Sequence, residues 1–76
     1  MDDVIEVEVN LDRDLRLDAF LKICGVAQTG GMAKLMIQDG VVSVNGSVEC
    51  RRGRRLAPGD EVEVEGVGNF RVAEER

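Results

Sequence analysis

The sequence predicts a single α+β domain, and the hydrophobic period, which changes twice along the chain, indicates this fold class. Residues 4–10 alternate apolar and polar side chains, which is typical of a half-buried strand, and the apolar ones are Ile5, Val7 and Val9. From residue 15 the apolar residues follow the period of a helix, and from residue 41 they alternate again. A strand, two short helices and then several strands within 76 residues fit one domain over residues 1–76.

The first helix is expected over about residues 15–24. Asp14 is the expected N-cap, and Gly25 is expected to end the helix. Arg16 and Lys22 lie outside the apolar face of this helix. The apolar side chains fall at the spacing of one helix face, and they are Leu17, Phe20, Leu21 and Cys24.

The second helix is expected to begin after Thr29 as its N-cap and to end at Gly40. Gly30 and Gly31 lie in its first turn, where they leave backbone N–H groups unshielded, and a helix N-terminus attracts anions. Lys34, one turn along, would lie beside such an anion. The two glycines are equally consistent with a tight turn between helices or with close helix packing, so both explanations stay open.

The remainder of the chain predicts short strands joined by turns. Asn45-Gly46 is a strong signal for a two-residue hairpin turn, with Val42 and Val44 before it and Val48 on the returning strand. The elements after the hairpin are a turn at residues 58–60, a strand at 61–65, a turn at 66–69 and a last strand with Phe70 and Val72.

The charge of the chain changes sign along its length, although the formal net charge is -5. Residues 1–14 hold six acids and one base (-5), residues 15–59 three acids and seven bases (+4), and residues 60–76 six acids and two bases (-4). Charges are screened beyond about 8 Å at physiological salt, so the basic middle governs the contacts made there. The net charge therefore does not exclude a polyanionic partner.

Four arginines lie within five positions, at Arg51, Arg52, Arg54 and Arg55. A guanidinium group keeps its charge at any physiological pH and matches two phosphate oxygens at once. We expect that these four arginines cannot all pair with acids, because Glu49 is the only acid close to them in the sequence. The cluster favours an anionic ligand such as nucleic acid, but a solvated loop or ion pairs with the acidic strands would also account for it.

The sequence offers little for catalysis or for the binding of metals and cofactors. It has no histidine, no recognisable nucleophile motif and no glycine-rich phosphate loop, so we expect no catalytic residue, no metal and no cofactor. Cys24 and Cys50 are expected to be reduced, mostly buried thiols in a cytoplasmic protein. No apolar run has the length of a membrane span or a signal peptide, and no membrane partner is expected.

The aromatic residues bear on the kind of nucleic acid. Phe20 and Phe70 are the only aromatic residues, and both fall on apolar faces. Proteins that bind single strands usually stack the bases on exposed aromatic rings. If the chain binds nucleic acid, it is therefore expected to contact backbone phosphates and 2′-hydroxyl groups of helical or folded RNA.

Four blocks of the sequence resemble the RNA-binding domain first seen in ribosomal small-subunit protein S-four, also called the alpha-L motif. They are residues 16–21, Thr29 with Ala33 and Ile37, residues 40–46, and Leu56 with residues 58–62. The likeness covers about residues 15–65 and is greatest to short bacterial members in which this domain stands almost alone. It implies two short helices packed on a small bent, mostly antiparallel sheet, here with an added N-terminal strand. It also implies a non-catalytic protein, expected as a monomer, that binds structured RNA (ribosomal or transfer RNA) in ribosome assembly or translation.

The resemblance assigns roles to residues by their position. Arg16 matches a position that faces RNA, Thr29 matches the cap of the second helix, and Lys34 matches a basic position after the alanine. Gly30 stands where many members have an arginine, which removes one phosphate contact and leaves the arginine cluster to supply more of the affinity. The expected RNA-binding residues are Arg16, Lys22, Thr29, Gly30, Gly31, Lys34, Asn45, Arg51, Arg52, Arg54 and Arg55.

An alternative function rests on the acidic strands. Glu61, Glu63 and Glu65 alternate with valines, and the usual role of such acids is a solvated strand face. The same face could dock a basic partner, for example a ribosomal protein, and the chain would then be a protein-interaction module. The arginine cluster is essential to the first function and the acidic strands to the second.

Overall fold

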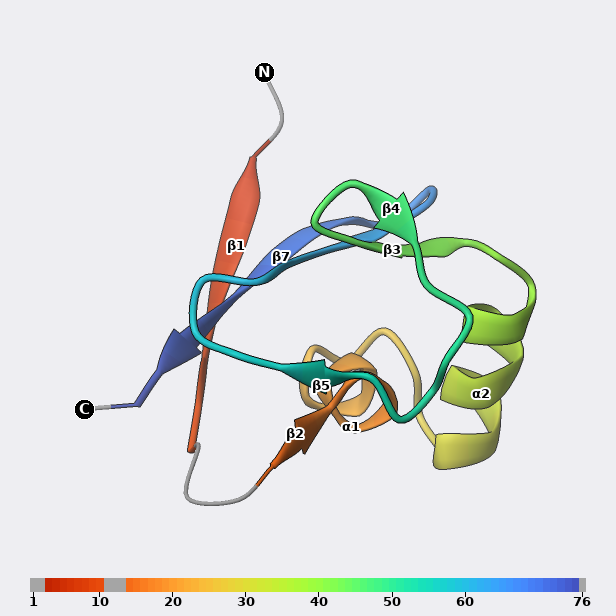
Figure 1. Ribbon diagram of the computed structural model, residues 1–76, viewed down its shortest axis with the longest axis horizontal. Coiled ribbons are helices and arrows are strands. Elements are labelled where there is room, and N and C mark those ends of the chain that lie inside the picture. The colour runs from red at the N-terminus through yellow and green to blue at the C-terminus, as the bar shows by residue number, and fades with distance from the viewer. Residues whose placement is uncertain (1–2, 11–13, 76) are drawn as a thin grey trace.

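The computed structural model describes residues 3–10 and 14–75, and this part of the chain forms two helices, a five-stranded sheet and a two-stranded sheet (Figure 1). The elements in chain order are β1 (Val4–Val9), β2 (Leu15–Arg16), α1 (Leu17–Ile23), α2 (Gly30–Gln38), β3 (Val42–Val44), β4 (Ser47–Val48), β5 (Arg55–Leu56), β6 (Glu61–Val64) and β7 (Gly68–Glu74). The predicted α+β class is confirmed, and the elements follow the predicted order except for two short strands, β2 and β5, which the sequence did not predict.

The five-stranded sheet has the order β1-β7-β6-β3-β4, so the first and last strands of the chain lie side by side (Figure 1). β1 runs parallel to β7, in a register that sets Ile5 beside Phe70 and Val7 beside Val72. The other neighbours in this sheet are antiparallel, which confirms a mostly antiparallel sheet. β2 and β5 form the separate two-stranded sheet, which is also antiparallel.

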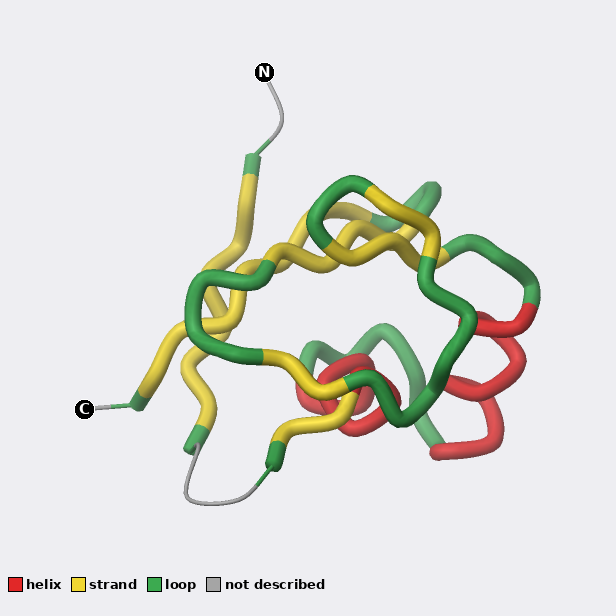
Figure 2. Tube along the Cα trace, in the orientation of Figure 1, coloured by secondary structure: helices red, strands yellow, loops and turns green. Residues whose placement is uncertain are grey.

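The hydrophobic core lies between the five-stranded sheet and the helices, which Figure 2 shows on one side of that sheet. Strands turn alternate residues toward the core: Val62 and Val64 of β6 are buried, whereas Glu61 and Glu63 between them are exposed. The largest side chains that are fully buried are Phe20, Leu17, Leu21, Ile37, Val42, Val44, Val62, Val64 and Val72. The opposite face of the sheet therefore carries the acidic side chains of its strands.

The beginning of α1 differs from the prediction. The sequence predicts a helix over about residues 15–24 that is capped by Asp14, whereas α1 begins at Leu17. The two preceding residues are extended because they form β2 and pair with β5. Arg16 therefore occupies the N-cap position, without a side-chain capping bond, and Asp14 forms an ion pair with Arg55 instead.

Two local signals have the expected structure. Thr29 caps α2, because its Oγ1 accepts a hydrogen bond of 3.1 Å from a backbone N–H in the first turn of the helix. Asn45 and Gly46 have φ angles of 51° and 88°, as the two-residue turn between β3 and β4 requires. The Asn45 side chain also joins this turn to the beginning of β6, since its Oδ1 accepts from the Glu61 N–H and its Nδ2 donates to Asp60.

Candidate nucleic-acid interface

The arginine loop, which we define as residues 51–55, lies against the beginning of α1. This helix has no side-chain cap, and its first N–H groups donate to carbonyls of the loop instead. The Leu17 N–H donates to the Arg54 carbonyl at 2.8 Å, and the Asp18 N–H donates to the Arg52 carbonyl at 3.1 Å. The pairing of β2 with β5 extends this contact. Main-chain bonds thus fix the position from which the arginine side chains emerge.

A buried carboxylate holds two arginines at this contact. Asp18 is 8% exposed, and its Oδ2 accepts a hydrogen bond of 3.0 Å from Arg52 Nε. The same Oδ2 lies 3.4 Å from Arg16 Nη2 in an ion pair. The other oxygen, Oδ1, accepts from the Ala19 N–H at 2.8 Å. Asp18 therefore joins an arginine of the loop to the arginine that precedes α1, and both arginine side chains stay about half exposed.

A second buried carboxylate, Glu49, holds two further arginines. Its oxygens accept hydrogen bonds from Arg51 Nε and Nη2 and from Arg54 Nη1, at distances of 3.1 to 3.2 Å. The hydrogen bonds from the Arg51 side chain lower the pKa of Glu49 to about 2, although burial of the carboxylate opposes this shift. Glu49 in turn raises the pKa of Arg51. The ionised form of both side chains is therefore favoured in the folded protein.

All four arginines of the loop have acidic partners, so the expectation that they cannot all pair is wrong. The pairs are Arg51 and Arg54 with Glu49, Arg52 with Asp18, and Arg55 with Asp14. The expectation considered only acids close in the sequence, whereas the fold brings Asp14 and Asp18 to the loop. Together with Arg16 there are five arginines and three carboxylates, which leaves two positive charges uncompensated. Each guanidinium also keeps unused N–H donors for a ligand.

The beginning of α2 lies beside Arg52. A Cβ atom at Gly30 would lie 3.7 Å from Arg52 Nη2, and one at Gly31 would lie 3.9 Å from Thr29 Oγ1. Both distances are ordinary contacts and neither glycine has a positive φ, so the fold itself requires neither of them. Close packing therefore does not explain the two glycines. An anion bound at the beginning of α2 remains a consistent explanation, because glycines leave the backbone N–H groups there unshielded.

The remaining predicted site residues lie on other parts of the described chain. Lys22 is exposed in the last turn of α1, and Lys34 is exposed in α2. Neither lysine forms an ion pair within residues 3–10 and 14–75. Asn45 uses its side chain in the turn between β3 and β4, as described above. Contacts of these three residues with RNA stay predictions.

The two cysteines differ in exposure. Cys24 is half-buried, and burial raises the pKa of its thiol to about 11. Cys50 is exposed beside the arginine loop, so the expectation of a mostly buried thiol is wrong for this residue. The reason is local, because Glu49 is the residue that turns inward here and its successor turns outward. Phe20 and Phe70 are buried as predicted, and no other aromatic side chain exists in the chain.

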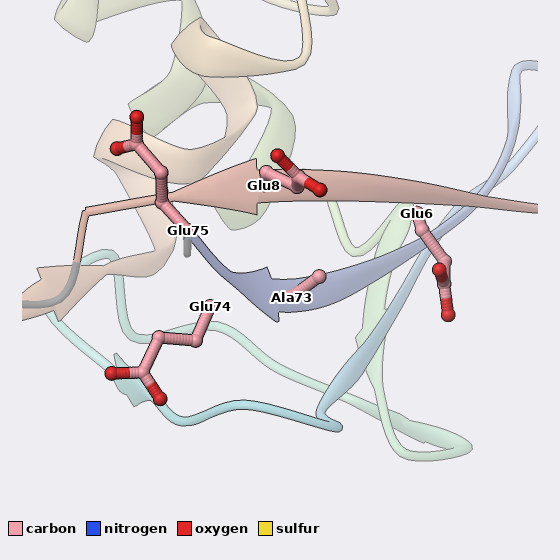
Figure 3. Close-up of a pocket in the computed structure, with 5 residues that line it drawn as sticks. All are labelled: Glu6, Glu8, Ala73, Glu74 and Glu75. Atoms are coloured by element: carbon pink, nitrogen blue, oxygen red, sulfur yellow. The ribbon is translucent and has the colours of Figure 1, made fainter.

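An open hollow of about 570 Å³ lies beside β1 and β7 (Figure 3). It is lined by Glu6, Glu8, Ala73, Glu74 and Glu75. Because four of these five residues are acidic, the hollow repels phosphate groups and is unsuited to nucleic acid. Among the described residues, no group of histidine, cysteine or acidic side chains is arranged to hold a metal ion, and no helix is long and apolar enough to cross a membrane.

Sequence reasoning named Glu49 as the acid nearest the arginines, but it missed that Glu49 and Asp18 are both buried beneath them. Asp18 and Glu49 are the buried charged residues of the described chain, and charged residues are seldom buried unless they are paired. For Glu49 a local signal existed, because Arg51 follows two positions later. No local signal joined Asp18 to Arg52, since 34 positions separate them and only the fold brings them together.

Comparison with known proteins relates the chain to one family. The family model described as the S4 domain matches residues 7–73. A protein of Bacillus subtilis (strain 168), named "Probable ribosome maturation protein RlbA", is 45% identical over 65 residues. The aligned part covers 84% of this chain and 92% of that relative.

Proposed function

The chain belongs to the S4 domain family, as the sequence blocks indicated, and from this premise we propose that it is a non-catalytic protein that binds structured RNA in the cytoplasm. Ribosomal RNA is the RNA we infer, and ribosome assembly is the process. The name of the relative from Bacillus subtilis supports both of these steps.

The single observation that carries the proposal is the arginine loop with its two buried acids. Arg51 and Arg55 have side chains that are 78% and 76% exposed, although both are paired. A guanidinium that is already hydrogen-bonded on one side can still present a fork of donors to a phosphate. Because both aromatic rings are buried, no ring is offered to unstacked bases, which favours helical or folded RNA.

The proposal is tested by the salt dependence of binding to a fluorescein-labelled hairpin of ribosomal RNA. If about three to five phosphates are contacted, log affinity is expected to fall against log salt concentration with a slope of roughly -2 to -4. Arg55→Ala is expected to weaken binding and to make this slope shallower by about one unit. The matched control is Arg71→Ala, which removes one charge from the acidic sheet face and is expected to leave affinity nearly unchanged. Absence of binding at low salt would refute the proposal.

A second candidate function is favoured by the acidic face of the sheet. Glu61 and Glu63 of β6 are exposed there, and Arg71 pairs with Glu6 and Glu61 at 3.3 and 3.5 Å. Such a face complements a basic protein, for example a ribosomal protein. Under this alternative, Glu63→Lys abolishes capture of purified basic ribosomal proteins and Arg55→Ala does not. Under the first proposal, Arg55→Ala weakens RNA binding and Glu63→Lys does not.

A further inference from the structure

We propose that Asp18 is a positioning residue for RNA binding, whose buried carboxylate holds Arg16 and Arg52 together as one preformed clamp for an RNA phosphate. This inference rests on the RNA binding proposed above. Charge alone would predict the opposite effect, because a carboxylate repels the phosphates of RNA. A negative side chain inside the interface is expected to strengthen the binding of a polyanion.

The carboxylate of Asp18 is anchored to the fold and not to the arginines alone. The main-chain N–H of Asp18 donates to the Arg52 carbonyl at 3.1 Å, and the side-chain Oδ1 of Asp18 accepts from the Ala19 N–H at 2.8 Å. Only Oδ2 faces the guanidinium groups, with Arg52 Nε at 3.0 Å and Arg16 Nη2 at 3.4 Å. Because Asp18 is 8% exposed and held by main-chain groups, it fixes the two arginines.

The guanidinium group of Arg16 lies against the arginine loop, and that of Arg52 lies beside the beginning of α2. Arg16 Nη2 lies 3.4 Å from the place that a Cβ atom would take at Gly53, and Arg52 Nη2 lies 3.7 Å from the corresponding place at Gly30. The arginine side chains are 53% and 41% exposed. Arg52 bonds Asp18 through Nε, so its two terminal nitrogens remain available to the oxygens of a phosphate.

The gain in affinity comes from ordering before binding. A free arginine side chain has many rotamers, and their loss on binding opposes association. Here the loss occurs when the protein folds, so a phosphate meets two donors that are already in place. Without Asp18 both arginines would keep their charge but lose their fixed geometry.

The test compares Asp18→Asn with Asp14→Asn. Each change removes one negative charge beside an arginine of the interface, and each keeps the size of the side chain. Asp14 forms its ion pair on the surface, with side chains 68% and 76% exposed, so it orders Arg55 only weakly. Asp14→Asn is therefore expected to leave affinity for the labelled ribosomal RNA hairpin unchanged or to increase it up to about twofold. Asp18→Asn is expected to weaken the same binding about tenfold, mainly through faster dissociation.

A second variant separates positioning from folding. Arg52→Lys keeps the charge, but lysine has no Nε–H and no planar fork, so it cannot bond Asp18 and a phosphate in the same way. It is expected to weaken binding about fivefold with little change in melting temperature. In the Arg52→Lys background, Asp18→Asn is expected to have a much smaller further effect.

The outcomes distinguish this inference from the proposed function. If the unaltered protein does not bind the hairpin at low salt, the proposed function and this inference both fail. If it binds, but Asp18→Asn binds as tightly as Asp14→Asn, the positioning role alone is refuted. The positioning role is also refuted if Arg52→Lys binds RNA as tightly as the unaltered protein. This second variant decides the question if Asp18→Asn folds poorly.

Discussion

Replacing Gly31 by alanine is expected to stabilise the protein and to weaken its binding to RNA. Gly31 is the second residue of α2 (Gly30–Gln38), its φ is not positive, and within 4 Å a Cβ atom there would meet Thr29 Oγ1 at 3.9 Å. Alanine is favoured over glycine inside a helix by roughly 0.5–1 kcal/mol. For a protein of this size, a gain of about 0.5 kcal/mol raises the melting temperature by about 2–4 °C.

The same methyl group is expected to disturb an anion at the beginning of α2. Thr29 accepts the N–H groups of Met32 and Ala33, through its Oγ1 and its carbonyl. Within the described residues, the N–H groups of Gly30 and Gly31 have no such acceptor, and they are the donors left for a phosphate. A side chain at residue 31 covers part of this surface, so we expect RNA affinity to fall about threefold to tenfold.

Thermal unfolding and fluorescence anisotropy with the ribosomal RNA hairpin measure the two effects. Gln38→Ala is the control, because this exposed residue ends the same helix and lies away from its beginning. It is expected to change stability slightly and RNA affinity not at all. A Gly31→Ala protein that binds RNA normally would show that the beginning of α2 lies outside the interface. A loss of stability would restore the explanation of this glycine by packing.

Three further measurements test the site and the core. The pKa of Glu49 is about 2 in the folded protein and 4.5 as a free side chain. Its ion pairs therefore stabilise the fold fully above about pH 4.5, and this stabilisation is lost as the pH falls toward 2. Glu49→Gln should lower the free energy of unfolding at pH 7 and make it depend less on pH between 4.5 and 2. Iodoacetamide should alkylate exposed Cys50 well before Cys24, whose pKa is about 11, and equal rates at the two thiols would contradict their different exposure. Bound RNA should slow the alkylation of Cys50, which lies beside the arginine loop. Phe20→Ala should cost about 3–5 kcal/mol, most of the stability of so small a protein, and a cooperative unfolding transition near the original temperature would contradict the assigned core.

Much of the fold could be predicted because its signals are local. Alternation in β1 and β6, the hydroxyl of Thr29 before α2 and the Asn45-Gly46 turn each act over a few residues, and each has the structure that its local chemistry favours. The beginning of α1 could not be predicted in this way. Arg16 has no local reason to be extended, and it is extended because Arg55 pairs with it across the β2–β5 sheet.

The candidate site was predictable in its charges and not in its arrangement. The arginines were visible as a cluster, but the sequence does not show that Asp14 and Asp18 lie beside them. An ion pair between residues far apart in the chain depends on the completed fold, because it forms only where main-chain bonds have already brought the two segments together. The bonds from α1 to the carbonyls of Arg52 and Arg54 do this here.

The position of the charges explains how an acidic protein can bind a polyanion. The protein measures 33 × 31 × 20 Å, so even its shortest dimension exceeds the distance of about 8 Å over which charges act at physiological salt. Charges on opposite faces of the protein are therefore largely screened from one another, and Glu61 and Glu63 are exposed because the alternate residues of β6 turn to the core. The same acids repel RNA that approaches from the sheet side. Under the proposed function, a net charge of -5 therefore does not oppose RNA binding as such but restricts the orientation in which RNA approaches the protein.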